Sequence, residues 1–191
     1  MHLLMMIVGF LLVFIVNPLI AYFNAYTVGK YWNDIQYSSF WQKTISVSAL
    51  VQSVIGFSMP ILGILLFIGY ITKTLTMNQI DLSIDLLWLS IIIPIVGSGI
   101  LITIESIKEA IRSRSFTNGA LAIWNLGSTI ENIFNMVSNF GSVIKDFEKR
   151  SDKEDDSSNL IVVLLVGIAL LLSVGGTVLS FNYGKSKSNY S

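Results

Sequence analysis

Four long runs of apolar residues, separated by short polar segments, dominate this sequence. The runs cover residues 3–23, 46–72, 85–104 and 160–181. Each has at least the roughly 20 residues that a helix needs to cross the hydrocarbon core of a bilayer. No Lys or Arg precedes the first run and no small-residue cleavage site follows it. We therefore interpret that run as an uncleaved first span and not as a signal peptide.

Between the third and fourth runs, residues 119–149 follow a heptad repeat instead of a continuous apolar run. Its two apolar positions hold Ile123, Ile130, Val137 and Ile144, and Leu126, Ile133, Phe140 and Phe147. Asn and Ser dominate the opposite face, so the pattern predicts one amphipathic helix of roughly 46 Å at 1.5 Å per residue. A soluble coiled coil usually has charged residues beside its apolar seam, and this stretch has almost none. We expect its apolar face to meet something broader than one helix.

These patterns predict an all-α membrane protein with four transmembrane helices and a long amphipathic helix between the third and fourth spans. Residues 1–104 would form a three-span region, in which residues 24–45 are a Tyr- and Trp-rich interfacial loop. Residues 105–157 would form a cytoplasmic or interfacial amphipathic helical segment. Residues 158–191 would supply the last transmembrane helix and a polar tail. Small residues recurring along the second and fourth spans predict close helix packing.

Composition and charge agree with a membrane location. The chain is 53% hydrophobic and 13% charged, against about 25% charged residues in soluble domains. Its formal net charge is zero, so bulk electrostatics give no reason to expect nucleic-acid binding. With four spans, most Lys and Arg fall on the side that holds residues 105–157. We expect an integral protein of the plasma or cell membrane, and the positive-inside rule then predicts that segment 105–157 is cytoplasmic and both termini are outside.

Few residues are suited to catalysis. The chain has no cysteine for thiolate chemistry, and its single histidine, His2, is at the N-terminus, so we expect no histidine metal site and no Ser-His-Asp triad. Glu105 and Glu109 lie one helical turn apart, but Lys108 and Arg112 are equally close to them. We therefore expect no catalytic, cofactor-binding or metal-binding residues, and a non-enzymatic protein.

Three placements of helix 119–149 remain open: on the membrane surface, against copies of itself or partner subunits, or partly across the bilayer in an oligomer. The favoured function is a subunit or scaffold of a membrane complex, whose partners are the lipid bilayer and either a homo-oligomer or other membrane subunits. Its expected interface is Ile123, Leu126, Ile130, Ile133, Val137, Phe140, Ile144 and Phe147. The alternative is a pore or translocation-channel component. Its polar path would contain Gln52, Asn125, Asn132 and Asn139.

Overall fold

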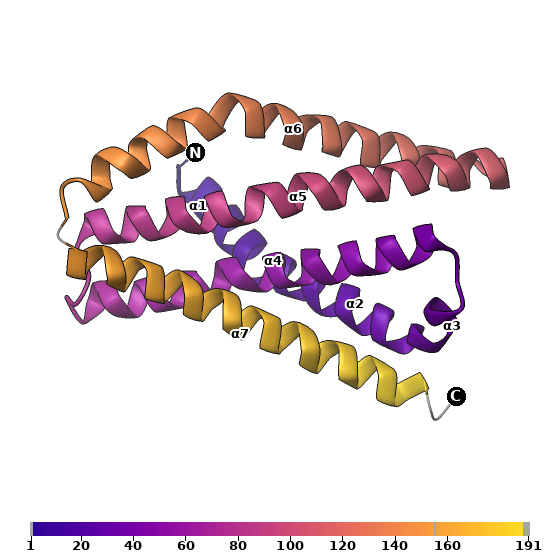
Figure 1. The fold of residues 1–191 in the computed structure, drawn as a ribbon, viewed down its shortest axis with the longest axis horizontal. Helices are drawn as coiled ribbons and strands as arrows, with labels where there is room; N and C mark the ends of the chain where they lie inside the picture. Colours follow the sequence, from indigo (N-terminus) through magenta and orange to yellow (C-terminus); the bar gives the residue numbers. More distant parts are fainter. Residues whose placement is uncertain (1, 155, 189–191) are drawn as a thin grey trace.

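The computed structural model describes residues 2–154 and 156–188, in which helices are joined by short turns and no strand occurs. The elements in order are α1 (His2–Leu11), η1 (Leu12–Val16), α2 (Asn17–Lys30), α3 (Trp32–Gln36), α4 (Phe40–Ile71), α5 (Met77–Ser113), α6 (Phe116–Ser151) and α7 (Asp156–Ser188). Figure 1 shows the long helices side by side along one axis. Four stretches are long and apolar enough to cross a membrane: Ile7–Lys30, Gln42–Ile71, Met77–Ser113 and Asp156–Lys187. The prediction of an all-helical, multi-pass membrane protein is confirmed.

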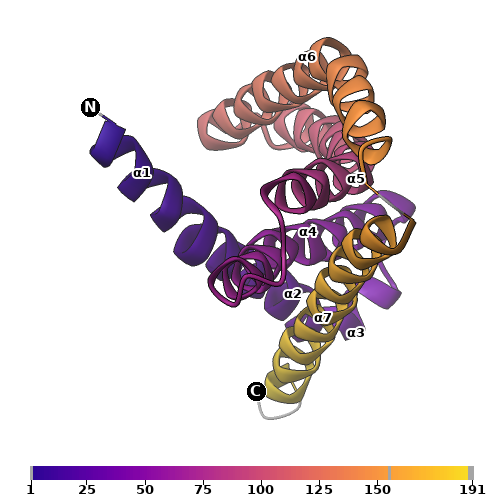
Figure 2. The ribbon, with the colours of Figure 1, turned by 90° about the vertical axis from the view of Figure 1, so that its left-hand side faces the viewer.

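Local sequence signals explain where the long helices begin. Ser39 caps α4 and Thr76 caps α5, each in a capping box with the glutamine three residues later, Gln42 and Gln79. The first span is interrupted in its middle, where the π-helical turn η1 comes directly before the Asn17–Pro18 pair at the start of α2. Proline has no backbone N–H and disturbs the hydrogen bonding of the preceding turn. Figure 2 shows α1 standing away from the other helices.

The bundle core lies where α4, α5 and α7 meet. Its fully buried apolar side chains are Leu62, Leu66, Leu87, Ile91, Val166 and Ala169. Small polar residues pack beside this core, as the spacing along the second and fourth spans predicted. The buried Ser53 hydroxyl lies 2.7 Å from the Ala21 carbonyl oxygen, to which it donates, and 3.1 Å from the Thr177 hydroxyl. One serine thereby joins α2, α4 and α7.

Two glycines bring α2 and α7 into backbone contact. A Cβ atom at Gly29 would collide with the carbonyl oxygen of Phe181, and one at Gly184 would collide with that of Tyr26. Gly184 is buried and lies inside α7, which continues to Ser188. The polar tail expected from Gly184 onward is therefore helical as far as Ser188.

The sequence left the course of α6 relative to the spans open, although segment 105–157 was expected to be cytoplasmic or interfacial. In the structure, α6 runs back along α5 (Figure 1). Asn125, near the start of α6, donates to the Ser106 hydroxyl, and Arg150, near its end, pairs with Asp81 at the start of α5. The link between the helices is only Arg114 and Ser115, and Arg114 has a left-handed φ of 50°. Such a short link turns the chain back onto the helix that it has just left.

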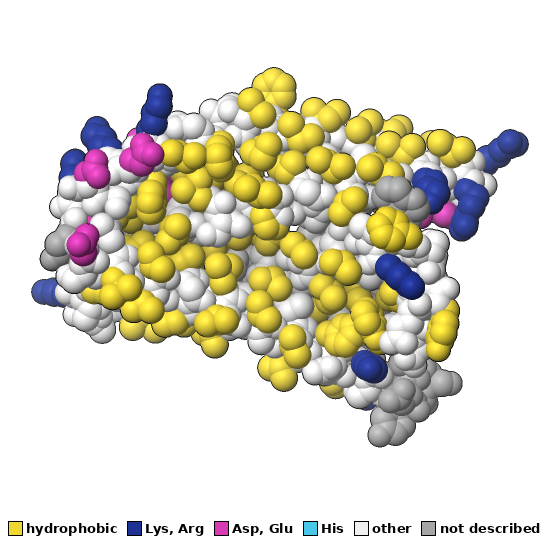
Figure 3. All heavy atoms as spheres, in the orientation of Figure 1, with side chains coloured by type: hydrophobic (Ala, Val, Ile, Leu, Met, Phe, Trp, Pro, Cys, Tyr) yellow, Lys and Arg dark blue, Asp and Glu magenta, His cyan; other side chains and the backbone are white. Residues whose placement is uncertain are grey.

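Because of this return, α5 and α7 point in the same direction. Asn159, at the start of α7, donates to the Ser151 carbonyl oxygen at the end of α6, beside the start of α5. Figure 3 shows apolar side chains over the middle of the visible face and charged side chains towards its two ends. This distribution suits a bilayer whose normal follows the long axis of the bundle.

Candidate functional site

Two threonines lie at the centre of the interface between α5 and α6. The hydroxyls of Thr103 and Thr129 are 2.8 Å apart, and Thr103 also donates to the Asn125 carbonyl oxygen at 3.0 Å. A Cβ atom at Gly99 would lie 3.1 Å from the Thr129 hydroxyl, so glycine provides the space for this close approach. Ala122, one heptad before Thr129, is also buried. Helix α6 thus packs against α5 through the heptad position of Ala122 and Thr129, which flanks the predicted apolar seam.

The predicted heptad residues consequently divide into two groups. Ile133, Phe140, Ile144 and Phe147 are half-buried, and the Phe140 ring lies 6.5 Å from the Trp88 ring of α5. In contrast, Ile123, Leu126, Ile130 and Val137 are exposed, with 73% of Val137 accessible. The apolar pattern in the sequence therefore combines residues beside α5 with residues that α5 leaves uncovered.

The antiparallel pairing sets the depth of α6 relative to the third span. Thr129 lies opposite Thr103, Phe140 opposite Trp88, and Arg150 opposite Asp81. Residues near 126–145 of α6 therefore lie beside the apolar run 85–104 of α5.

This part of α6 carries a row of exposed polar side chains, which we call the polar stripe. It consists of Ser128, Glu131, Asn135, Ser138, Asn139 and Ser142. The hydroxyls of Ser138 and Ser142 turn back to carbonyl oxygens of their own helix, at 3.5 Å and 2.8 Å. The stripe faces away from α5 and lies level with an apolar span.

The structure does not gather the four predicted path residues in one place. Gln52 donates to the Ser98 hydroxyl at 3.4 Å between α4 and α5. Asn125 donates to Ser106 at 2.6 Å across the interface of α5 and α6. Asn132 is half-buried and Asn139 is exposed. Of the four, only Asn139 belongs to the polar stripe. Glu131 was absent from the predicted path, although its spacing from Ser128 and Asn135 puts it on the same helix face.

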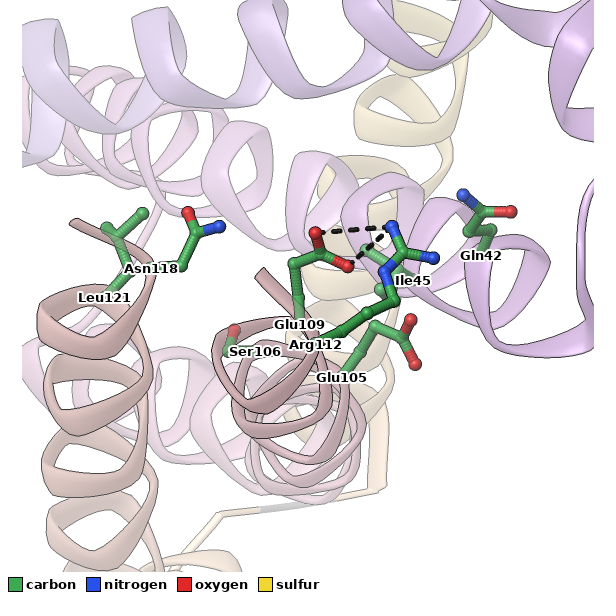
Figure 4. A pocket seen from close by; sticks show the side chains of 8 residues that line it. All are labelled: Gln42, Ile45, Glu105, Ser106, Glu109, Arg112, Asn118 and Leu121. Carbon is green, nitrogen blue, oxygen red and sulfur yellow. Dashed lines mark hydrogen bonds and ion pairs between the residues drawn. The ribbon is translucent and has the colours of Figure 1, made fainter. Parts of the chain in front are cut away.

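A cavity of about 380 Å³ opens where α4, α5 and α6 meet, close to the α5–α6 link. Its lining residues, drawn in Figure 4, are Gln42, Ile45, Glu105, Ser106, Glu109, Arg112, Asn118 and Leu121. Arg112 Nη2 lies 3.0 Å from Glu109 Oε2, and Lys108 Nζ lies 3.6 Å from Glu105 Oε2. Each carboxylate therefore has a basic neighbour on its own helix, as the sequence spacing predicted.

Among the residues that the structure describes, neither this cavity nor another part of the bundle resembles a metal centre. Within residues 2–154 and 156–188, no group of three or more His, Cys, Asp or Glu side chains is placed to hold an ion. The most distinctive chemical feature is instead the polar stripe at the depth of the spans.

No family model, curated protein or solved structure matches this chain. The fold and its surface therefore define a class only: a multi-pass, all-helical integral membrane protein.

Proposed function

We propose that this chain is a non-enzymatic subunit or scaffold of a membrane assembly, and that α6 is the helix through which it assembles. The observation that supports this proposal is the uncovered polar stripe of α6, which lies level with the apolar run of α5. Polar side chains at membrane depth require protein or water beside them, because hydrocarbon offers no hydrogen-bonding partner.

The proposal gives α6 the role of an additional membrane crossing. Since α5 and α7 run in the same direction, a bilayer that both of them cross must also be crossed by the helix that connects them. The end that holds the link between α5 and α6 carries Lys30, Lys43, Lys108, Arg112, Arg114, Lys185 and Lys187. The opposite end carries Lys73, Lys145, Lys149, Arg150 and Lys153. By a narrow margin, this distribution favours a cytoplasmic C-terminus and an external N-terminus in the proposed topology.

The need of polar side chains for protein or water also changes the proposed contact surface of α6, from the predicted apolar seam to the polar stripe. Ile123, Ile130 and Val137 face outward at the predicted seam, but lipid chains satisfy exposed apolar side chains as well as a protein does. The polar stripe has no such alternative. We therefore place the assembly contact on the side of Glu131 and Asn135 and leave the apolar side to lipid.

A pair of single-cysteine variants tests this assignment in native membranes. Asn135→Cys lies on the polar stripe, and Val137→Cys lies about 160° away around a helix of 3.6 residues per turn. Both side chains are exposed, and the chain has no cysteine of its own. After labelling with a benzophenone maleimide and illumination, position 135 should give protein–protein adducts and position 137 should give lipid adducts. Lipid adducts alone from position 135 would refute the proposed contact surface.

A further inference from the structure

We propose that the partner of α6 is α6 of further copies of this chain, and that their polar stripes line a water-filled path for cations. Glu131 would form a ring of carboxylates in that path. This inference rests on the proposed function, because it specifies the occupant of the same contact surface and the ligand that passes it.

The length and position of the stripe support a path across the membrane. From Ser128 to Ser142 it extends about 21 Å at 1.5 Å per residue, which is most of a hydrocarbon core of roughly 30 Å. It follows one helix face and is exposed along its whole length. Polar side chains of this kind typically face a bundle interior or a water-filled cavity.

The chemistry of the stripe favours identical copies as its partners. Copies that insert in the same direction are related by an axis along the membrane normal, so each residue meets its equivalents at one depth. An asparagine amide both donates and accepts hydrogen bonds, and Asn135 and Asn139 are therefore complementary to themselves. Symmetric copies of one chain satisfy the stripe without requiring a second kind of protein.

The charge of Glu131 requires the contact between copies to contain water. Its side chain is exposed, and no Lys or Arg occurs in α6 between its start and Lys145. Carboxylates brought together at one depth would repel each other strongly in a dry seam. Water and counter-ions around the axis weaken this repulsion, and rings of Glu or Asp select cations in membrane pores. The pairing of Thr103 with Thr129 puts Glu105 opposite residue 127, so the ring would lie about 6 Å inside the level of Glu105.

Planar-bilayer recordings of the purified full chain, under a KCl gradient, test the inference. Wild-type protein should conduct, with a reversal potential near that of K⁺. Glu131→Gln should keep the oligomer and the conductance but lower the K⁺-over-Cl⁻ preference, so that the reversal potential moves from that of K⁺ towards zero, as expected when a ring loses its charge. Glu131→Asp should retain the preference. Glu148→Gln is the matched control on the same helix, outside the stripe, and should behave as wild type.

Native mass spectrometry of the same samples separates this inference from the proposed function. A homo-oligomer without conductance would overturn the cation path and leave the assembly proposal standing. A complex in which a different protein contacts the stripe would overturn the homo-oligomer. Unchanged selectivity in Glu131→Gln would overturn the carboxylate ring. A monomer whose position 135 reacts only with lipid would refute both proposals.

Discussion

The Thr103 and Thr129 hydroxyls lie 2.8 Å apart in the buried centre of the interface between α5 and α6. In this contact α6 packs against α5 through the small polar side chain of Thr129, which lies beside Gly99. The neighbouring Ile130 is thereby turned outward, and the polar stripe is turned away from the rest of the chain. The rotation of α6 about its axis, and hence the surface that it offers to partners, follows from this pair.

Substitutions at Thr129 should measure what the contact contributes. Thr129→Val keeps the shape and removes the hydroxyl, so we expect a loss of about 0.6 kcal/mol in the free energy of unfolding, the average for such bonds in membranes. Thr129→Leu adds volume against Gly99 and should cost about 1–3 kcal/mol. Unfolding in mild detergent, followed by tryptophan fluorescence, gives both values. Ile130→Leu on the exposed side is the control, and equal stability of Thr129→Leu and this control would contradict the interface.

The glycine contact between α2 and α7 gives a second prediction. Gly29→Ala and Gly184→Ala place a Cβ atom against a backbone carbonyl oxygen, which cannot move aside without shifting a helix. Each should lower the free energy of unfolding by about 1–3 kcal/mol. Gly175→Ala is the matched control in α7, because nothing lies within 4 Å of its Cβ position. That change should be neutral or stabilising by up to about 1 kcal/mol, owing to the better helix propensity of alanine. Equal behaviour of all three variants would show that α2 and α7 lie farther apart.

The ion pair between Asp81 and Arg150 gives a third prediction, about the other end of α6. The two side chains are 54% and 33% exposed, so their coupling should be modest. A double-mutant cycle with Asp81→Asn and Arg150→Gln should give under about 1 kcal/mol. The coupling should shrink as the salt concentration rises, because salt screens charges at this exposure. No coupling at low salt would mean that this pair does not hold the end of α6 beside the start of α5.

Much of the fold follows from the sequence by simple rules. Long apolar runs identified the four helices that are able to span a membrane, and polar–apolar periodicity identified the continuous helix around Thr129. The small residues of the last span, including Ser173 and Thr177, are buried as expected. The region around Gly184 was harder to interpret, because Lys185 and Lys187 made a membrane-proximal helical turn resemble a polar tail.

Apolar run length and periodicity could not predict that α7 runs in the same direction as α5. Hydropathy gives little sign that a helix containing Glu131 and several asparagines lies level with the spans. Counting basic residues assigned the group from Lys145 to Lys153 to the same side as Arg112, whereas the structure puts Arg150 beside Asp81, at the opposite end of α5 from Arg112. The heptad pattern revealed the apolar positions of α6 but not which of them meets α5. That choice depends on the fit between Thr129 and Gly99, which only the packed structure shows.

The central claim is that α6 crosses the membrane, and cysteine accessibility tests it most directly. Ser115 and Asp152 flank α6 and are exposed, and the absence of native cysteine allows clean single-cysteine variants. Tyr37→Cys and Met77→Cys serve as references for the two ends of the bundle. With a membrane-impermeant maleimide on intact cells, Ser115→Cys should react from the same side as Tyr37→Cys, and Asp152→Cys from the same side as Met77→Cys. Labelling of Ser115→Cys and Asp152→Cys from one side would contradict the account.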